Sequence, residues 1–432
     1  MIFYMKIKQI QAEEILDSRG NPTISTKVIL ENNIIGWANV PSGASTGKHE
    51  AIELRDNDLS RYQGLGVLKA IDNVNSLITK ALIGKDVDQQ KEIDRIMIEL
   101  DGTENKSKLG ANAILSVSLA VARAAANIEN IPLYQYLSRF NPNHQEEFVM
   151  PVPQMNIMNG AKHANWATDI QEFMIFPVGA SSVQKAVEMG ATVYQNLKVI
   201  LKQQGHSINV GDEGGFAPLV KNNFEPFQLI LQAVGKAGYK LGQDIVLGID
   251  AAASEFYSDG KYSLKKENKI LSNKELLDFY LEMQSRYPIV SLEDIFDQDD
   301  WEGFQMITEK IGKTTQIIGD DLYVTNVKRL QKGIDEKTTN SILIKLNQIG
   351  TLTETIDAIL LARQAEMTVV VSHRSGETED AFMADFVVAM GTGQIKAGAP
   401  CRSERVVKYN RLMMIERELG EKAEYAKFPF TS

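Results

Sequence analysis

The second half of the chain repeats one unit, a short apolar run that ends on a charged or polar residue. The end residues are Glu213, Asp250, Glu293, Asp320, Lys345, His373 and Lys396. The spacings between them are 37, 43, 27, 25, 28 and 23 residues, and about 25 residues is what one strand and one returning helix require. Runs rich in Val and Ile without polar alternation are typical of strands buried on both faces. The repeat therefore predicts a parallel β/α barrel of the TIM type.

Helices are expected between these strands. Thr351 and Glu354 form a capping box, which is a signature of a helix start. The strands of such a barrel bring their C-terminal ends to one mouth, where functional residues gather. Each end residue taken alone could be an ordinary solvated loop residue. Seven in the same position of the unit favour a shared pocket.

The first part of the chain has a different pattern. Residues 24–30 and 34–40 are β-rich and are separated by a plausible hairpin turn, and residues 64–130 change to a helical period. A proline-containing segment without periodicity follows. We therefore expect an α/β protein with a smaller N-terminal α+β domain, residues 1–140, and a C-terminal barrel domain, residues 141–432.

Composition narrows the class of protein. The formal net charge of −10 disfavours nucleic acid as a main partner, because an acidic surface repels phosphate backbones. Cys401 is the only cysteine, which excludes an intrachain disulfide and suits a reducing compartment. The N-terminal apolar run is too short for a signal peptide. Residues 111–126 are apolar but are interrupted by Asn112, two serines and Arg123, which is not typical of a membrane span. We expect a cytoplasmic protein, although a surface or secreted pool without a signal peptide stays open.

Three of the end residues, Asp250, Glu293 and Asp320, are carboxylates on neighbouring strands. Like charges crowded together are costly unless a cation lies among them. Oxygen ligation without cysteine or clustered histidine indicates Mg²⁺ before Zn²⁺. The five histidines show no H-E-x-x-H spacing, which disfavours a zinc hydrolase. The alternative is a salt-bridge network between the carboxylates and the lysines of the same series.

The other end residues provide proton-transfer and anion-binding groups. Lys345 and Lys396 end two strands, and a lysine beside a metal and a second ammonium group has a lowered pKa, which makes it a possible base. Glu213 lies on the far side of the series and could act as an acid. This arrangement suits removal of a proton next to a carboxylate, followed by loss of a leaving group. Arg374 and Ser375 offer a guanidinium and a hydroxyl for a phosphate.

Residues 42–48, S-G-A-S-T-G-K, resemble a phosphate-binding loop but are one residue short of that motif. His49 also stands where the motif needs Ser or Thr. We interpret the segment as a mobile glycine- and serine-rich loop, or as a plain surface turn.

Nine motifs, read together in order, point to one family. They are L-D-S-R-G-N-P (16–22), P-S-G-A-S-T-G (41–47), D-I-Q-E-F-M (169–174), G-D-E-G-G-F-A-P (211–218), S-L-E-D (291–294), G-D-D-L (319–322), I-K-L-N-Q-I-G-T-L-T-E-T (344–355), S-H-R-S-G-E-T-E-D (372–380) and G-Q-I-K-A-G-A-P (393–400). With these motifs the chain resembles the enolase family over essentially its whole length. The resemblance implies a Mg²⁺-dependent enzyme that interconverts 2-phosphoglycerate and phosphoenolpyruvate, a step of glycolysis and gluconeogenesis.

The resemblance also implies a role for each residue. The first Mg²⁺ would be held by Asp250, Glu293 and Asp320, and a second by Ser42 when its loop closes. Lys345 would be the base and Glu213 the acid, with Lys396 stabilising an enediolate intermediate. The remaining substrate-binding residues would be His163, Glu172, His373, Arg374 and Ser375. Members of the family are usually homodimers, and some assemble further.

The chain departs from the family pattern at a few positions. Ala161 replaces a usual glycine, and if that position has a positive φ, alanine costs about 1 kcal/mol. Asn165 and Trp166 are unusual in the same loop, and Glu13 stands where many members carry Arg. The last change puts the dimer contacts implied by the resemblance in doubt, but not the chemistry.

Other functions remain to be weighed. A related lyase of the same superfamily could act on a non-phosphorylated acid, but S-H-R-S and the Ser42 loop favour a substrate that carries a phosphate. A binding or structural role without catalysis is disfavoured, because the expected base, acid and metal carboxylates are all present. A surface or partner-binding role in addition to catalysis stays open.

Overall fold

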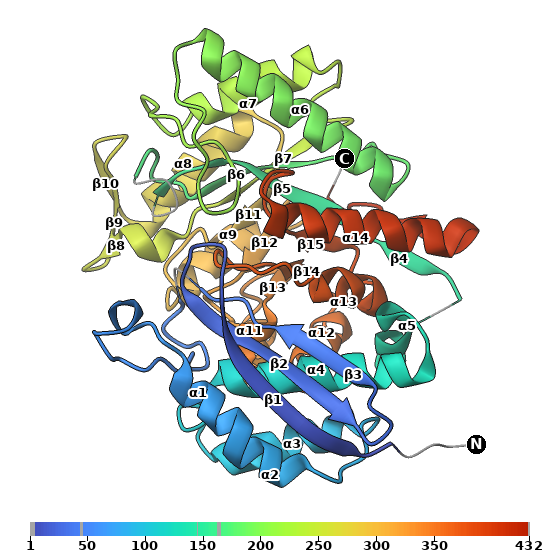
Figure 1. Ribbon diagram of the computed structural model, residues 1–432. Coiled ribbons are helices and arrows are strands. Elements are labelled where there is room, and N and C mark those ends of the chain that lie inside the picture. Colours follow the sequence, from blue (N-terminus) through green and yellow to red (C-terminus); the bar gives the residue numbers. More distant parts are fainter. Residues whose placement is uncertain (1–4, 44–45, 145, 162–165, 431–432) are drawn as a thin grey trace.

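The computed structural model describes residues 5–43, 46–144, 146–161 and 166–430 (Figure 1). The N-terminal part contains a three-stranded antiparallel sheet in the order β1-β2-β3. Its strands are β1 (Ile7–Leu16), β2 (Pro22–Leu30) and β3 (Ile35–Asn39). The expected hairpin joins β2 to β3, where Leu30 N–H donates to Ile34 O.

The N-terminal sheet packs on one long helix, α4 (Ala111–Glu129). Ile24 and Val28 of β2 are fully buried on this face. Among the described residues, α4 is the one helix with the length and hydropathy of a membrane span, and 83% of its most apolar window is buried inside the protein. It is therefore the core helix of this part. The other N-terminal helices are η1 (Tyr62–Gly64), α1 (Leu68–Asn73), η2 (Val74–Ile78), α2 (Thr79–Leu82), α3 (Gln90–Asp101) and α5 (Leu133–Ser138).

Eight strands of the C-terminal part close into a barrel in the order β11-β12-β13-β14-β15-β5-β6-β7. They are β5 (Val152–Asn159), β6 (Glu172–Phe176), β7 (Val246–Asp250), β11 (Ile289–Glu293), β12 (Gln316–Gly319), β13 (Ser341–Ile344), β14 (Thr368–Ser372) and β15 (Gln394–Lys396). The expected barrel next to a smaller α+β part is confirmed.

Helices lie outside the barrel, as Figure 1 shows. The longer ones are α6 (Val183–Gln203), α7 (Glu225–Lys236), α8 (Asn273–Arg286), α9 (Trp301–Ile311), α10 (Val327–Asp335), α12 (Leu352–Gln364), α13 (Phe382–Met390) and α14 (Ser403–Leu419). The expected cap of α12 is present, because the Thr351 side chain accepts from Glu354 N–H. The shorter elements are β4 (Phe148–Met150), η4 (Ala253–Phe256), β8 (Tyr257–Ser258), β9 (Lys261–Leu264), β10 (Lys269–Leu271), α11 (Leu346–Ile349), η5 (Gly420–Lys422) and β16 (Ala423–Tyr425).

The barrel differs from the sequence prediction in the direction of one strand. We expected an all-parallel barrel, but β6 runs antiparallel to both of its neighbours, β5 and β7. The first residue of β6 therefore lies at the mouth where its neighbour β7 ends. In this register Glu172 is paired with Asp250. The reversed strand thus adds a carboxylate to the mouth from its N-terminal end.

Glu213 does not end a barrel strand, and this part of the prediction is wrong. It lies in the loop between α6 and α7, where Val210 and Phe216 form only isolated bridges. The apolar residues before Glu213 resemble a strand, but the first two barrel strands are β5 and β6, earlier in the chain. The other six expected end residues are the last residue of a barrel strand or the residue directly after one.

Candidate active site

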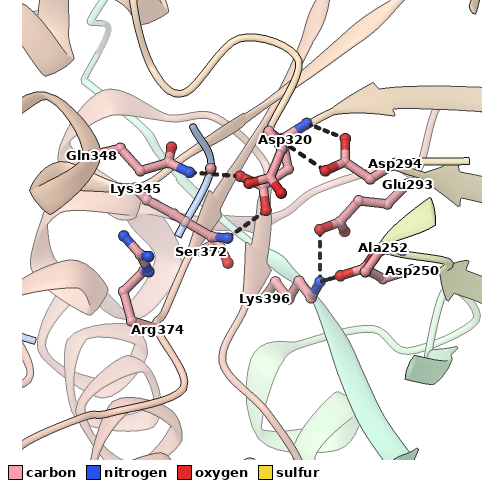
Figure 2. Close-up of polar contacts among 12 residues, drawn as sticks. Asp250, Ala252, Glu293, Asp294, Asp320, Lys345, Gln348, Ser372, Arg374 and Lys396 are labelled. Carbon is pink, nitrogen blue, oxygen red and sulfur yellow. Dashed lines mark hydrogen bonds and ion pairs between the residues drawn. The ribbon is translucent and has the colours of Figure 1, made fainter. Parts of the chain in front are cut away.

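Carboxylates at the barrel mouth surround one ammonium group, Lys396 at the end of β15. Its Nζ lies 3.0 Å from Asp250 Oδ2 and 2.8 Å from Glu293 Oε1 (Figure 2). It also lies 3.2 Å from Glu172 Oε2. All four side chains are buried. Strands β6, β7 and β11 therefore each bring one acid to the same lysine.

Burial dominates the protonation of this cluster. It raises the pKa of Glu293 well above its usual range, and the nearby Asp250 raises that pKa further. The pKa of Glu172 is raised in the same way by burial and then by Glu213. Burial acts to lower the pKa of Lys396, but Asp250 and the other carboxylates outweigh it and hold this pKa well above its usual value. Lys396 is therefore a fixed positive charge.

The donor set fits a hard divalent cation. Glu293 Oε2 is buried and accepts no hydrogen bond from the residues that the structure describes. A buried carboxylate oxygen without a partner is costly, and carboxylate oxygens are what Mg²⁺ prefers. Asp250, Glu293 and Asp320 follow three neighbouring barrel strands, and all three are buried. These residues could hold the ion.

Two further acids, which sequence reasoning missed, lie beside Asp320. Asp294 accepts from the backbone N–H groups of Asp320 and Asp321, both at 2.8 Å. Carboxylate oxygens of these three residues come within 4.8 Å of one another. Burial raises the pKa of Asp321 to about 8, and Asp320 adds to the increase. Both acids follow a strand-end acid directly in S-L-E-D and G-D-D-L, and that doubling could have identified them.

Lys345 is bound to Asp320 through its ammonium group. Gln348 Nε2 donates to the other oxygen of this carboxylate, Asp320 Oδ1, at 2.8 Å. Burial acts to lower the pKa of Lys345, but the neighbouring carboxylates, Asp320 first and then Asp321, together hold this pKa above the usual value. The lowered pKa expected for Lys345 is thus not produced by the groups of the chain alone, because its closest charged partner is a carboxylate.

Glu213 and His373 lie beside each other in the lining of the pocket that also contains Lys345. Glu213 Oε2 accepts a hydrogen bond from Asn156 Nδ2 at 2.9 Å. His373 Nε2 lies 3.6 Å from the same oxygen. Burial lowers the pKa of His373 to about 4; Glu213 opposes this decrease and Arg405 adds to it. The imidazole is therefore neutral at physiological pH.

Arg374 is held by residues from two parts of the chain. Its Nη1 lies 2.9 Å from Glu50 Oε2 and its Nη2 lies 3.2 Å from Glu50 Oε1. Nη1 also donates to Asn347 Oδ1 at 2.8 Å. Glu50 belongs to the N-terminal part, so this pair connects it to the barrel mouth. Ser375 is buried next to Arg374.

Ser42 is buried next to the turn that joins β1 to β2. Its hydroxyl donates to Asp17 and accepts from Arg19 Nη2 at 3.2 Å. Its backbone N–H donates to Gly376 O at 2.7 Å, and Gly376 N–H donates back to Ser42 O at 2.9 Å. Among the described residues, the hydrogen-bond partners of its hydroxyl are Asp17 and Arg19 rather than the proposed metal carboxylates.

The loop after β5 carries two of the unusual residues in strained conformations. Ala161 has φ 38° and Trp166 has φ 60°, so both lie in the left-handed region. Lys265 Nζ lies 5.4 Å from the centre of the Trp166 ring. His163 and Asn165 lie outside the described residues. The unusual Glu13 forms an exposed ion pair with Lys27 at 3.1 Å.

One pocket brings most of the expected residues together. Its lining includes Glu172, Glu213, Asp250, Asp320, Lys345, His373, Arg374, Ser375 and Lys396. The lining of this pocket therefore contains acids, bases, a guanidinium and a hydroxyl. Such a set can remove a proton, donate a proton and hold a phosphate at the same time.

Comparisons with known proteins cover the whole described fold. Residues 7–137 match the family model described as "Enolase, N-terminal domain". Residues 147–431 match "Enolase, C-terminal TIM barrel domain". A curated relative, Enolase 2 of Methanospirillum hungatei JF-1, is 56% identical over 422 residues. That alignment covers 98% of this chain and 97% of the relative.

Proposed function

The chain belongs to the enolase family and is a phosphopyruvate hydratase, a lyase of glycolysis, and on that premise we propose how its residues divide the reaction between them. The substrate is 2-phosphoglycerate, whose dehydration yields phosphoenolpyruvate. The observation that supports the proposal is that Lys345, Glu213 and His373 line one pocket with different partners. Lys345 contacts Asp320, whereas Glu213 accepts from Asn156 and lies beside His373. Lys396 and the acids Glu172, Asp250 and Asp320 line the same pocket.

We propose that Asp250, Glu293 and Asp320 hold the first of two Mg²⁺ ions. The buried, unsatisfied Glu293 Oε2 supports this choice. When bound, Mg²⁺ supplies positive charge that makes an enediolate intermediate less costly. Ser42 is the proposed ligand of the second ion, and in this structure its hydroxyl donates to Asp17 and accepts from Arg19.

Lys345 is the proposed base, which takes the proton next to the substrate carboxylate. It can do so only as the neutral amine, and its contact with Asp320 opposes that state. A carboxylate whose negative charge is engaged by another cation holds the proton on a neighbouring lysine less strongly. The pairing of Lys345 with a metal-ligand carboxylate therefore couples the base to the loaded site.

Glu213 is the proposed acid, which protonates the departing hydroxyl. The neutral His373 beside it adds no positive charge that would favour the carboxylate form. Glu172 lines the same pocket, and burial together with Glu213 raises the pKa of Glu172. Two acids that crowd each other tend to retain one proton between them. Glu172 and Glu213 together can therefore provide a proton at neutral pH.

Substrate binding is assigned to the remaining groups. Lys396, a fixed positive charge, faces the substrate carboxylate and stabilises the enediolate. Arg374 and Ser375 bind the phosphate, with Glu50 and Asn347 holding the guanidinium in place. His163 remains a predicted pocket residue.

We further propose that the chain acts in the cytoplasm as a homodimer or a larger homo-oligomer, and that its two domains divide at residues 1–140 and 141–432. Sedimentation at assay concentrations tests the assembly. A fully active monomer would contradict it.

The metal assignment is tested by a Mg²⁺ titration of wild type and Asp320→Asn, followed by the absorbance of phosphoenolpyruvate. EDTA should abolish turnover and Mg²⁺ should restore it, because the carboxylates need a hard cation. Loss of one ligand charge should raise the Mg²⁺ concentration at half-activity by about 10-fold or more. Full activity in metal-free buffer, or the same titration curve for both proteins, would show that the assignment is wrong.

A further inference from the structure

Arg405, on the first turn of α14, is a buried charge that the proposed reaction does not use. Its side chain is 0% exposed and is among the largest fully buried side chains of the described residues. Its nearest carboxylate oxygen, Glu404 Oε1, lies 3.5 Å from Nε, and Nε has no hydrogen-bond partner among the described residues. Burying a guanidinium is costly unless its N–H groups are paired. Such a cost indicates a purpose beyond packing.

The two terminal nitrogens of the guanidinium contact uncharged acceptors in two loops, the one that carries Glu213 and the one that carries Arg374. Nη2 donates to Ser375 O at 2.6 Å and to Asp212 O at 3.1 Å. Nη1 donates to Arg374 O and contacts His373 Nδ1. Asp212 directly precedes the proposed acid, and the other acceptors belong to the loop that binds the phosphate. The planar guanidinium of Arg405 therefore fixes the position of the two loops relative to each other.

The contact with His373 also decides where the imidazole carries its proton. A guanidinium in a protein does not give up a proton, so it can only donate. His373 Nδ1 must then accept, and the single proton of the neutral ring resides on Nε2. That nitrogen is the one that lies 3.6 Å from Glu213 Oε2. The ring therefore presents an N–H to the proposed acid instead of a lone pair.

We propose that Arg405 is a positioning residue for the dehydration step, which holds His373 as its Nε2–H tautomer opposite Glu213 and fixes the two loops that carry the acid and the phosphate-binding residues. This inference rests on the proposed roles of Glu213 and His373. A lone pair on Nε2 would instead compete with the leaving hydroxyl for the proton of Glu213. An N–H on Nε2 stabilises the carboxylate that Glu213 becomes once it has given this proton to the leaving hydroxyl.

The tautomer can be read directly by NMR of protein labelled with ¹⁵N in its five histidines. The spectrum of His373→Asn identifies the His373 signals by their absence. Wild type should show a neutral ring with the proton on Nε2 and a ¹⁵N shift typical of a lone-pair-bearing Nδ1. A wild-type spectrum with the proton on Nδ1 overturns the proposal. Because the spectrum is recorded without substrate, this outcome is independent of whether the proposed reaction roles are correct.

Arg405→Met tests the consequence, with Arg411→Met as the matched control. Arg411 lies on the same helix, but its partners are Asp385 and Glu418, outside the pocket. Both changes should lower the melting temperature. Only Arg405→Met should lower kcat, by about 10- to 100-fold with a smaller change in KM, and give mixed His373 tautomers. Equal kcat in the two variants, or an unchanged tautomer in Arg405→Met, overturns the proposal.

The pH profile supplies a third readout. The charged groups that face the imidazole are Glu213, Glu377 and Arg405. Since Arg405 contributes to the lowered pKa of His373, its removal should raise that pKa and move the acidic limb of the kcat profile to higher pH. If Arg405→Met does not fold, Arg405→Lys keeps the charge but lacks the planar fork. It should fold and lose part of kcat, because one ammonium group cannot hold the acceptors of both loops, and a wild-type kcat would overturn the proposal.

Discussion

Lys345 and Asp320 show how a single contact can set the state of a catalytic group. The sequence placed both residues at neighbouring strand ends and predicted a lowered lysine pKa. The side chains instead form an ion pair that raises this pKa. Residue types and spacing could predict that the two groups meet. They could not predict which charge lies closest to Nζ, because that depends on rotamers and on partners such as Gln348.

Ala161 provides a prediction at the scale of one residue. It is buried and has φ 38°, a conformation that glycine adopts with less strain. Ala161→Gly should therefore raise the free energy of unfolding by up to about 1 kcal/mol, as measured by chemical denaturation. Ala167→Gly is a control, because Ala167 is buried in the same loop without a positive φ, and it should destabilise. A lower unfolding free energy for Ala161→Gly would show that the backbone at this site is not strained.

The residue pattern of each strand explains which parts of the barrel could be predicted from the sequence. Buried parallel strands such as V-L-G-I-D and S-I-L-I are short apolar runs, so their ends were found correctly. Strand β5, V-P-Q-M-N-I-M-N, alternates polar and apolar residues and does not resemble a fully buried strand, although every residue in it is buried. Gln154 and Asn156 find hydrogen-bond partners inside the barrel. The reversed direction of β6 leaves no local signal, because strand direction is decided by tertiary packing.

The segment that carries Ser42 gives a prediction at the element scale. Ser42 is held by Asp17 and by a two-way backbone pairing with Gly376, next to the phosphate-binding residues. Ser42→Ala keeps the backbone pairing, so the fold and binding of the first Mg²⁺ should be preserved. It should lower kcat, because the proposed second ion loses a ligand. Calorimetric Mg²⁺ titration and the absorbance assay measure the two effects. A wild-type rate would mean that the segment is a plain turn.

The whole molecule carries a net charge of −10, yet its proposed substrate is anionic. Local cations resolve this conflict, since Lys345, Arg374 and Lys396 all line the pocket. Lys396 ends a barrel strand, Lys345 directly follows one, and Arg374 is the second residue after one. The barrel therefore concentrates positive charge at one mouth of an acidic protein. Glu213, which comes from the loop between α6 and α7, adds an acid to the same pocket.

The central claim is that Lys345 and Glu213, which line the same pocket, act in separate steps. If Lys345 removes the proton first, an enediolate forms before the hydroxyl leaves. In deuterated water, Glu213→Gln should still exchange the α-hydrogen of 2-phosphoglycerate, because the base remains. It should form little phosphoenolpyruvate, because nothing protonates the departing hydroxyl. Lys345→Ala should lose both exchange and dehydration.

Deuterium incorporation, followed by mass spectrometry alongside product absorbance, is the most direct measurement of this claim. Exchange retained in Glu213→Gln and lost in Lys345→Ala is the predicted result. Exchange lost in Glu213→Gln and retained in Lys345→Ala would mean that the acid and the base are reversed. Equal loss of exchange in both variants would contradict separate roles for the two residues.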